Sequence, residues 1–178
     1  IRSLLKQETG KKDFDVFLEL FSLIEHLKET SKIAKKALRP SRRSSGVMKN
    51  KKATVLYEPL GTAGIISPWN YPLTTPLTIS AEALLAGNNV ILKPSEHTPL
   101  TISYIKELWD KYIGFNEAFN LVFGGGNVGQ MLVEADGIDM ICFTGSSKVG
   151  KIIAEQCSSK LKPFILELGG KDPLIVLK

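Results

Sequence analysis

Short apolar runs alternate with helix-forming segments through most of the chain. The runs lack polar alternation, as do strands that are buried on both faces of a sheet. They cover 62–67, 90–93, 118–123, 138–143 and 164–167, and the segments between them, 75–87, 98–114, 128–135 and 146–158, have helical patterns. The order β-α-β-α-β-α-β-α-β predicts an α/β fold with a doubly wound, mostly parallel, Rossmann-like sheet.

Local signals support two of these helices. Threonine followed by proline, at 75–76 and again at 98–99, combines an N-cap residue with the residue favoured in the first helical turn. Gly87 and Gly114 follow the same two segments, at the position where helices commonly end in a left-handed residue. Both helices are therefore expected to begin and end near these residues.

The first 53 residues have a different pattern. Apolar residues at helical spacing between 13 and 37 predict one helix with a stripe that packs on the rest of the protein. This stripe consists of Phe14, Phe17, Leu18, Phe21, Ile24 and Leu27. From Lys28 to Lys52 there are ten basic residues and one acid, with loop composition around Pro40. A flexible linker fits this run, and contact with nucleic acid is the alternative.

A new segment begins near Ala53, where 54–57 reads as a short strand and indicates a small β hairpin. We expect an N-terminal helix and basic linker over 1–53, an α/β domain over 54–170 and the start of a truncated segment over 171–178. Within the last segment, 174–177 reads as an apolar strand without a partner. An unpaired edge of this kind predicts self-association through that end.

Composition narrows the function classes. The hydrophobic share of 43% in 178 residues fits an ordinary globular core. No run reaches the length of a membrane helix and no secretory leader is visible, so a cytoplasmic location is expected. Cys142 and Cys157 lack metal-ligand spacing and are expected to be buried thiols, and His26 is expected near the surface without a ligand role.

Unusual residues follow each predicted strand. They are Trp69 and Asn70 after the first, Lys93, Ser95 and Glu96 after the second, Gly124, Gly126 and Gly129 after the third, Gly145 and Ser146 after the fourth, and Glu167 at the end of the fifth. The carboxyl ends of parallel strands meet at one edge of a doubly wound sheet, where ligands bind. We therefore expect these residues to form one site.

Their chemistry suits a nucleotide. Lys93 can donate to ribose hydroxyls and Glu96 can accept from them, although a surface ion pair has the same sequence. A carboxylate at 96 would repel a 2′-phosphate, which favours NAD over NADP. Thr144-Gly145-Ser146 is the better anion site, because the glycine allows close approach and the hydroxyls and N–H groups at a helix start can hold a phosphate, although an ordinary capped βα turn has the same sequence. The G-x-G-x-x-G match at 124–129 is weak alone, because no acid follows cleanly about twenty residues later.

Five motifs taken together resemble the aldehyde dehydrogenase superfamily in order and spacing. They are Glu58-Pro59-Leu60-Gly61, Ser67-Pro68-Trp69-Asn70-Tyr71-Pro72-Leu73, Lys93-Pro94-Ser95-Glu96, Phe143-Thr144-Gly145-Ser146 and Glu167-Leu168-Gly169-Gly170-Lys171. The resemblance implies NAD(P)-dependent oxidation of an aldehyde to a carboxylic acid through a cysteine thioester. It also implies that 54–170 is the NAD(P)-binding domain of a larger, homo-oligomeric enzyme.

The resemblance implies a role for each matching residue. Asn70 would stabilise the oxygen of the tetrahedral intermediate, and Glu167 would be the general base for thioester hydrolysis. The implied cofactor contacts are Trp69, Lys93, Ser95, Glu96, Gly126, Gly145, Ser146, Val149, Glu167, Leu168 and Gly169. No metal is implied.

The catalytic cysteine of that family is absent, because it lies a few dozen residues beyond the Glu-Leu-Gly-Gly motif. The chain is therefore interpreted as a cofactor-binding fragment that is inactive alone, with the identity of the aldehyde left open. The alternative is a non-catalytic nucleotide-binding or assembly module whose basic segment contacts nucleic acid.

Overall fold

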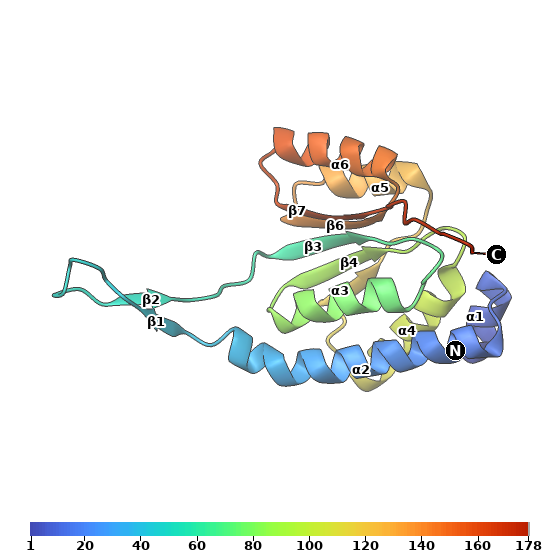
Figure 1. Cartoon of the computed structure of the whole chain (residues 1–178), viewed down its shortest axis with the longest axis horizontal. Coiled ribbons are helices and arrows are strands. Elements are labelled where there is room, and N and C mark those ends of the chain that lie inside the picture. The colour runs from blue at the N-terminus through green and yellow to red at the C-terminus, as the bar shows by residue number, and fades with distance from the viewer. Residues whose placement is uncertain (178) are drawn as a thin grey trace.

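A five-stranded parallel sheet forms the centre of the protein, whose computed structural model describes residues 1–177 (Figure 1). Its strands are β3 (Thr62–Ile66), β4 (Asn89–Lys93), β5 (Phe119–Leu121), β6 (Met140–Gly145) and β7 (Phe164–Leu168). They lie in the order β5-β4-β3-β6-β7, so the chain builds outward in one direction from β3 and then in the other from β6. The predicted doubly wound fold is confirmed, with its switch point between β3 and β6.

Two helices cover each face of this sheet (Figure 1). On one side are α3 (Thr74–Leu85) and α4 (Pro99–Tyr112), and on the other are α5 (Gly126–Glu134) and α6 (Ser147–Ser159). Each layer has its own core: Ile102 of α4 packs with Leu92 and Phe119, whereas Ile153 of α6 packs with Ile141 and Leu132. Burial of the strands on both faces explains their lack of polar alternation.

The predicted helix ends agree with the structure, but two of the caps differ. Gly87 and Gly114 have φ of +89° and +77°, the left-handed conformation expected after α3 and α4. At the other ends, α3 begins at Thr74 with Leu73 as its N-cap, so the expected cap Thr75 lies inside the helix. Neither Leu73 nor Thr98, the N-cap of α4, makes a side-chain capping bond. Carboxylates from the N-terminal part of the chain instead accept hydrogen bonds from the first backbone N–H groups of α3 and α4.

The N-terminal segment forms α1 (Arg2–Thr9) and α2 (Asp13–Ala37), and α2 packs along α3 (Figure 1). The prediction of its packed face was wrong. Five members of the stripe expected to be buried, Phe14, Phe17, Leu18, Phe21 and Ile24, are between 43% and 68% exposed. The buried face instead carries Val16, Glu19 and Leu23, because Glu19 has hydrogen-bond partners there.

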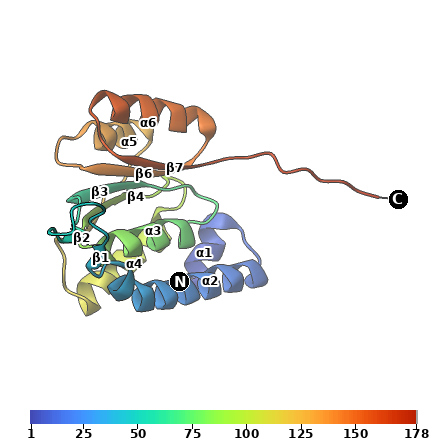
Figure 2. The same cartoon turned by 60° about the vertical axis from the view of Figure 1, so that its left-hand side comes forward.

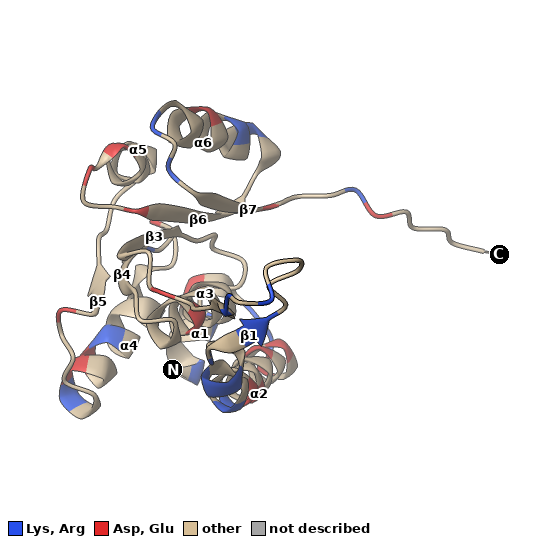
Figure 3. Ribbon diagram, turned by 90° about the vertical axis from the view of Figure 1, so that its left-hand side faces the viewer, with Lys and Arg blue, Asp and Glu red and all other residues tan. Residues whose placement is uncertain are grey.

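The basic segment contributes a strand where the sequence suggested only a linker. Strand β1 (Ser41–Arg43) pairs antiparallel with β2 (Ala53–Val55), with Arg42 opposite Thr54. This hairpin projects beyond the end of α2 and the sheet (Figure 1), and its first strand is strongly basic (Figure 3). The pairing of a short polar strand depends on its partner more than on its own composition.

The expected strand at 174–177 is wrong for this structure. Residues 169–177 have no helix or strand, and Figure 2 shows them leading away from β7. Leu174, Ile175, Val176 and Leu177 are between 81% and 88% exposed. A strand requires a neighbour for its N–H and C=O groups, and no strand of residues 1–177 lies beside this segment. Among the described residues, no helix combines the length and apolarity needed to cross a membrane.

Candidate functional site at the carboxyl edge of the sheet

Glutamates from the N-terminal helices cap the two helices on one side of the sheet. Oε1 of Glu19 in α2 accepts from the N–H groups of Leu73 and Thr74, at 3.0 and 3.2 Å. Glu8 in α1 does the same for α4, because its carboxylate accepts from the N–H groups of Leu100 and Thr101. The N-termini of α3 and α4 therefore already hold an anion each.

The helices on the other side begin without such a carboxylate. Helix α5 starts after Gly125 with no side-chain cap, and α6 starts after Ser146, whose Oγ accepts from the Val149 N–H at 3.3 Å. Free N–H groups and the positive end of the helix dipole attract anions. The arrangement thus directs an anionic ligand toward α5 and α6.

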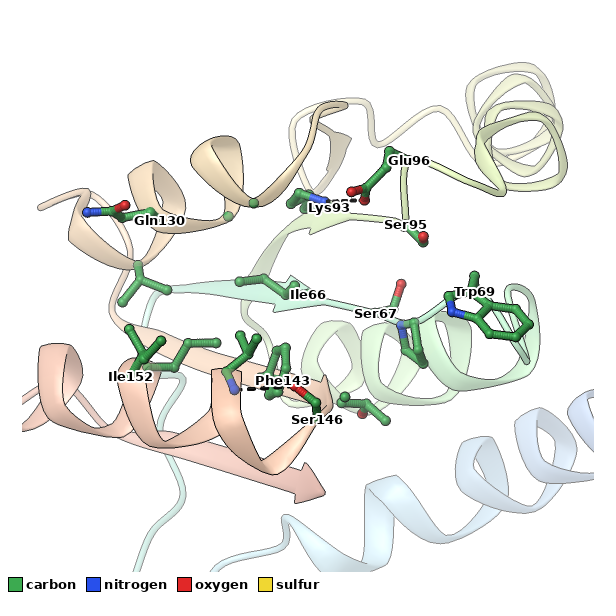
Figure 4. Close-up of a pocket in the computed structure, with 18 of the residues that line it drawn as sticks. Ile66, Ser67, Trp69, Lys93, Ser95, Glu96, Gln130, Phe143, Ser146 and Ile152 are labelled. Carbon is green, nitrogen blue, oxygen red and sulfur yellow. Dashed lines mark hydrogen bonds and ion pairs between the residues drawn. The ribbon is translucent and has the colours of Figure 1, made fainter. Parts of the chain in front are cut away.

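A cavity of about 520 Å³ lies at this edge, between α5 and α6 and the ends of β3, β4 and β6 (Figure 4). It brings together eight of the predicted cofactor residues: Trp69, Lys93, Ser95, Glu96, Gly126, Gly145, Ser146 and Val149. These come from four separate segments of the chain. Their convergence agrees with the expectation that residues after successive strands meet at one site.

Two lining residues have unsatisfied hydroxyls: Ser67, which the sequence did not single out, and Thr144, which belongs to the expected anion site at 144–146. Ser67 follows β3, Thr144 belongs to β6, and both line the cavity. Their Oγ atoms are buried and lack a hydrogen-bond partner within the described part of the chain. A buried hydroxyl without a partner is costly, so these two groups are suited to bind a polar ligand. For Ser67, its position next to a strand end was the only available signal.

Lys93 and Glu96 face each other at the end of β4 (Figure 4). The Lys93 side chain is buried, and its Nζ lies 3.6 Å from Oε2 of Glu96 and donates to the Pro94 carbonyl at 3.1 Å. A hydrogen bond from its own backbone N–H, followed by the charge of Lys93, lowers the pKa of Glu96. The pair therefore offers one cationic donor and one anionic acceptor to the cavity.

The stem of Lys93 is accommodated by a glycine of α5. A Cβ on Gly129 would lie 3.6 Å from Cδ of Lys93 and 3.8 Å from Cδ1 of Ile66. A larger side chain there would enter the space between α5 and the end of β4. The last glycine of the G-x-G-x-x-G match thus provides close packing of the helix against the strand ends.

The residues with implied catalytic roles lie beside the cavity instead of lining it. Asn70 is exposed and follows Trp69, and its Oδ1 accepts from the Tyr71 N–H at 3.1 Å, which leaves Nδ2 as the outward donor. Glu167 is exposed in β7, directly opposite Thr144 in the strand register. Leu168 and Gly169 also lie outside the lining, and Gly169 accepts from Ser147 Oγ at 3.5 Å.

Both thiols are buried, as the sequence predicted. Cys142 is 4% exposed and Cys157 is 1% exposed. Burial, with a smaller effect from the Glu82 carboxylate, raises the pKa of Cys142 to about 11, and burial also raises the pKa of Cys157. His26 lies on the surface of α2, where its Nε2 is 3.0 Å from Oε1 of Glu82. No group of three or more potential metal ligands occurs among the described residues.

The sequence model of the aldehyde dehydrogenase family matches residues 1–178. The chain belongs to the aldehyde dehydrogenase family. A Mycobacterium bovis protein named as a succinate-semialdehyde dehydrogenase for NADP⁺ is 35% identical over 178 residues, which are 100% of this chain and 34% of that protein. The betaine aldehyde dehydrogenase of Vibrio vulnificus is 44% identical over 119 residues, or 67% of this chain and 24% of the relative.

Solved structures agree with this membership. A Mycobacterium tuberculosis aldehyde dehydrogenase in complex with NAD⁺ superposes with a TM-score of 0.89 and 34% identity, over 96% of this chain and 35% of the other. The chain thus spans about a third of the length of the relatives that it matches. The family is NAD(P)-dependent, and the names of these proteins include both NADP⁺ and NAD⁺.

Proposed function

We propose that this chain is the cofactor-binding part of an enzyme that oxidises an aldehyde to a carboxylic acid with NAD(P). The observation that carries the proposal is the cavity at the switch point of the sheet. It is lined by the ion pair of Lys93 and Glu96, by two hydroxyls without a hydrogen-bond partner among the described residues, and by the N-terminus of α6, which is capped by a serine and not by a carboxylate. A dinucleotide has matching groups: hydroxyls, a diphosphate and two rings. When bound, its nicotinamide accepts the hydride of the aldehyde.

Each part of the cavity suits one part of the dinucleotide. Lys93 and Glu96 would hold ribose hydroxyls, as donor and acceptor. Ser146 and the N-terminus of α6 would hold the diphosphate, because N–H groups at a helix start attract anions. The adenine would lie between α5 and α6, against the apolar side chains of Val149 and Ile152. Ser67 and Thr144 would donate to polar atoms nearer the strand ends.

Asn70 and Glu167 would act on the substrate. The free Nδ2 of Asn70 would donate to the aldehyde oxygen as negative charge develops on it, an interaction commonly worth about 3–4 kcal/mol in the transition state. Glu167 would take a proton from the water that hydrolyses the thioester. Burial and raised pKa make Cys142 and Cys157 unsuitable as the nucleophile, so we expect this chain alone to bind cofactor without turnover.

NAD is the preferred cofactor in this proposal. The lowered pKa of Glu96 keeps its carboxylate ionised at neutral pH, beside the position proposed for a ribose. Negative charge there repels the 2′-phosphate of NADP. Glu96→Gln is therefore expected to narrow the preference for NAD⁺ over NADP⁺, which titrations with both dinucleotides measure directly.

Titration of the purified chain with NAD⁺ tests the binding site. Loss of a hydrogen bond to a charged group commonly weakens binding by about 10- to 100-fold, and we expect this for Lys93→Ala and Glu96→Ala. Glu25 and Lys28 are a matched control, because they form an exposed pair at the same spacing in α2, away from the cavity. Alanine at either control position should leave the Kd unchanged. If Lys93→Ala and Glu96→Ala bind NAD⁺ with the Kd of the unmodified chain, the ribose assignment is wrong.

A further inference from the structure

Glu19 of α2 is a buried acid that the proposed chemistry does not use. It is 2% exposed, and its Oε1 accepts from the backbone N–H groups of Leu73 and Thr74. Its Oε2 lies 2.5 Å from the Nζ of Lys11, and its backbone carbonyl accepts from the Thr74 hydroxyl at 3.1 Å. A carboxylate is costly to bury unless its oxygens are satisfied, and here both have partners.

These contacts hold the C-terminal end (the far end) of the loop that carries Trp69 and Asn70, between β3 and α3. The near end is held by the sheet, where the Ser67 N–H donates to the Lys93 carbonyl at 3.1 Å. The far end is held by Glu19, through the N–H groups at the start of α3. Between the two anchors, the loop contains no strand or helix of its own. Its position therefore depends on these end contacts.

Lys11 adds a second contact to the same loop. Its ammonium, besides pairing with Glu19, lies 3.9 Å from the centroid of the Tyr71 ring. This distance is within the range of a cation–π interaction. Tyr71 also donates its backbone N–H to Oδ1 of Asn70, which leaves the Asn70 Nδ2 as a donor. Lys11 thus contacts both the carboxylate behind the loop and the residue that orients the Asn70 amide.

We infer that Glu19 and Lys11 are positioning residues that hold Trp69 at the cofactor cavity and Asn70 beside it. The role proposed for Asn70 rests on the proposed function, whereas the contacts that hold the loop do not. The N-terminal helices would then contribute to the site without touching either ligand. Loss of Glu19 leaves the first N–H groups of α3 without an acceptor and releases one of the two anchors.

The test combines amide hydrogen exchange, followed by NMR, with NAD⁺ titration of the chain. In Glu19→Ala the Leu73 and Thr74 amides should exchange at least about tenfold faster, since a charged acceptor is lost. The NAD⁺ Kd should rise severalfold through Trp69. Glu19→Gln keeps an acceptor oxygen, so it should restore part of the amide protection and part of the NAD⁺ affinity. Glu25→Ala is the control, because Glu25 lies on the same helix and pairs only with exposed Lys28.

The outcomes separate positioning from general stability. If the amides of β3, β4 and β6 stay protected while Glu19→Ala binds NAD⁺ as Glu25→Ala does, the inference is wrong. Should Glu19→Ala fail to fold, Lys11→Met decides. Weaker NAD⁺ binding by Lys11→Met with a protected sheet supports the inference, and wild-type binding by this variant overturns it. If the unmodified chain binds no NAD⁺, the proposed function fails, but exchange at Leu73 and Thr74 still tests the anchor.

Discussion

Single residues determine which groups of this chain can react. Because burial raises the pKa of Cys142 from 9.0 to about 11, its thiolate is about 100-fold rarer at pH 8 than in an unfolded chain. We expect a thiol reagent to modify Cys142 at least about 100-fold more slowly in the native chain than in denaturant. Its native reactivity should rise about tenfold per pH unit and level off near pH 11. Rapid labelling of one equivalent at pH 8 would contradict the buried positions.

The candidate site shows which residues a sequence can identify. Lys93 and Glu96 were predictable because charges directly after an apolar strand reach the carboxyl edge of the sheet. Thr144 was expected at the anion site as part of the Thr144-Gly145-Ser146 turn. Ser67 was not predictable, because a hydroxyl side chain finds a partner in most environments, and only its burial without a partner within the described residues marks it for a ligand. Glu19 was missed for a related reason: a glutamate in a charged helix gives no sign that it caps a helix more than fifty residues away.

At the scale of elements, the contact of α5 with the central strand β3 depends on Gly64. A Cβ there would lie 2.9 Å from Cδ1 of Ile141, 3.0 Å from Cγ2 of Ile138 and 3.3 Å from Cγ of Leu132. Gly64→Ala should overpack this layer and reduce the free energy of unfolding by about 1–3 kcal/mol. Gly137→Ala is the control, because a Cβ at Gly137 meets nothing within 4 Å. Equal denaturation midpoints for the two variants would contradict the close packing.

Elements with a strong local signal were predicted well, and those that depend on a distant partner were not. The five strands of the sheet and their helices were correct because apolar runs and turn residues specify them locally. Helix α2 has two apolar faces, and only contact with α3 decides that Leu23 is buried and Phe21 exposed. Strand β1 exists through its pairing with β2, whereas 174–177 has no neighbour to pair with.

The whole molecule exposes apolar side chains on β7 and on the extended residues that follow it. Strand β7 is an edge of the sheet, with Ile165 at 54% and Leu168 at 40% exposed. The extended residues that follow include Ile175 and Leu177, exposed at 81% and 85%. Edge strands and exposed apolar segments promote pairing between chains.

We therefore predict that the 178-residue chain associates with itself through 174–177. Static light scattering should give a mass above 19.6 kDa that rises with concentration. The double substitution Ile175→Lys and Leu177→Lys should bring the mass close to that of the monomer, because two added charges oppose burial of the segment. Val47→Lys is the control, since Val47 is 96% exposed but lies in the hairpin loop. A concentration-independent monomeric mass for the unmodified chain would contradict association, and loss of association in Val47→Lys alone would place the contact at the hairpin.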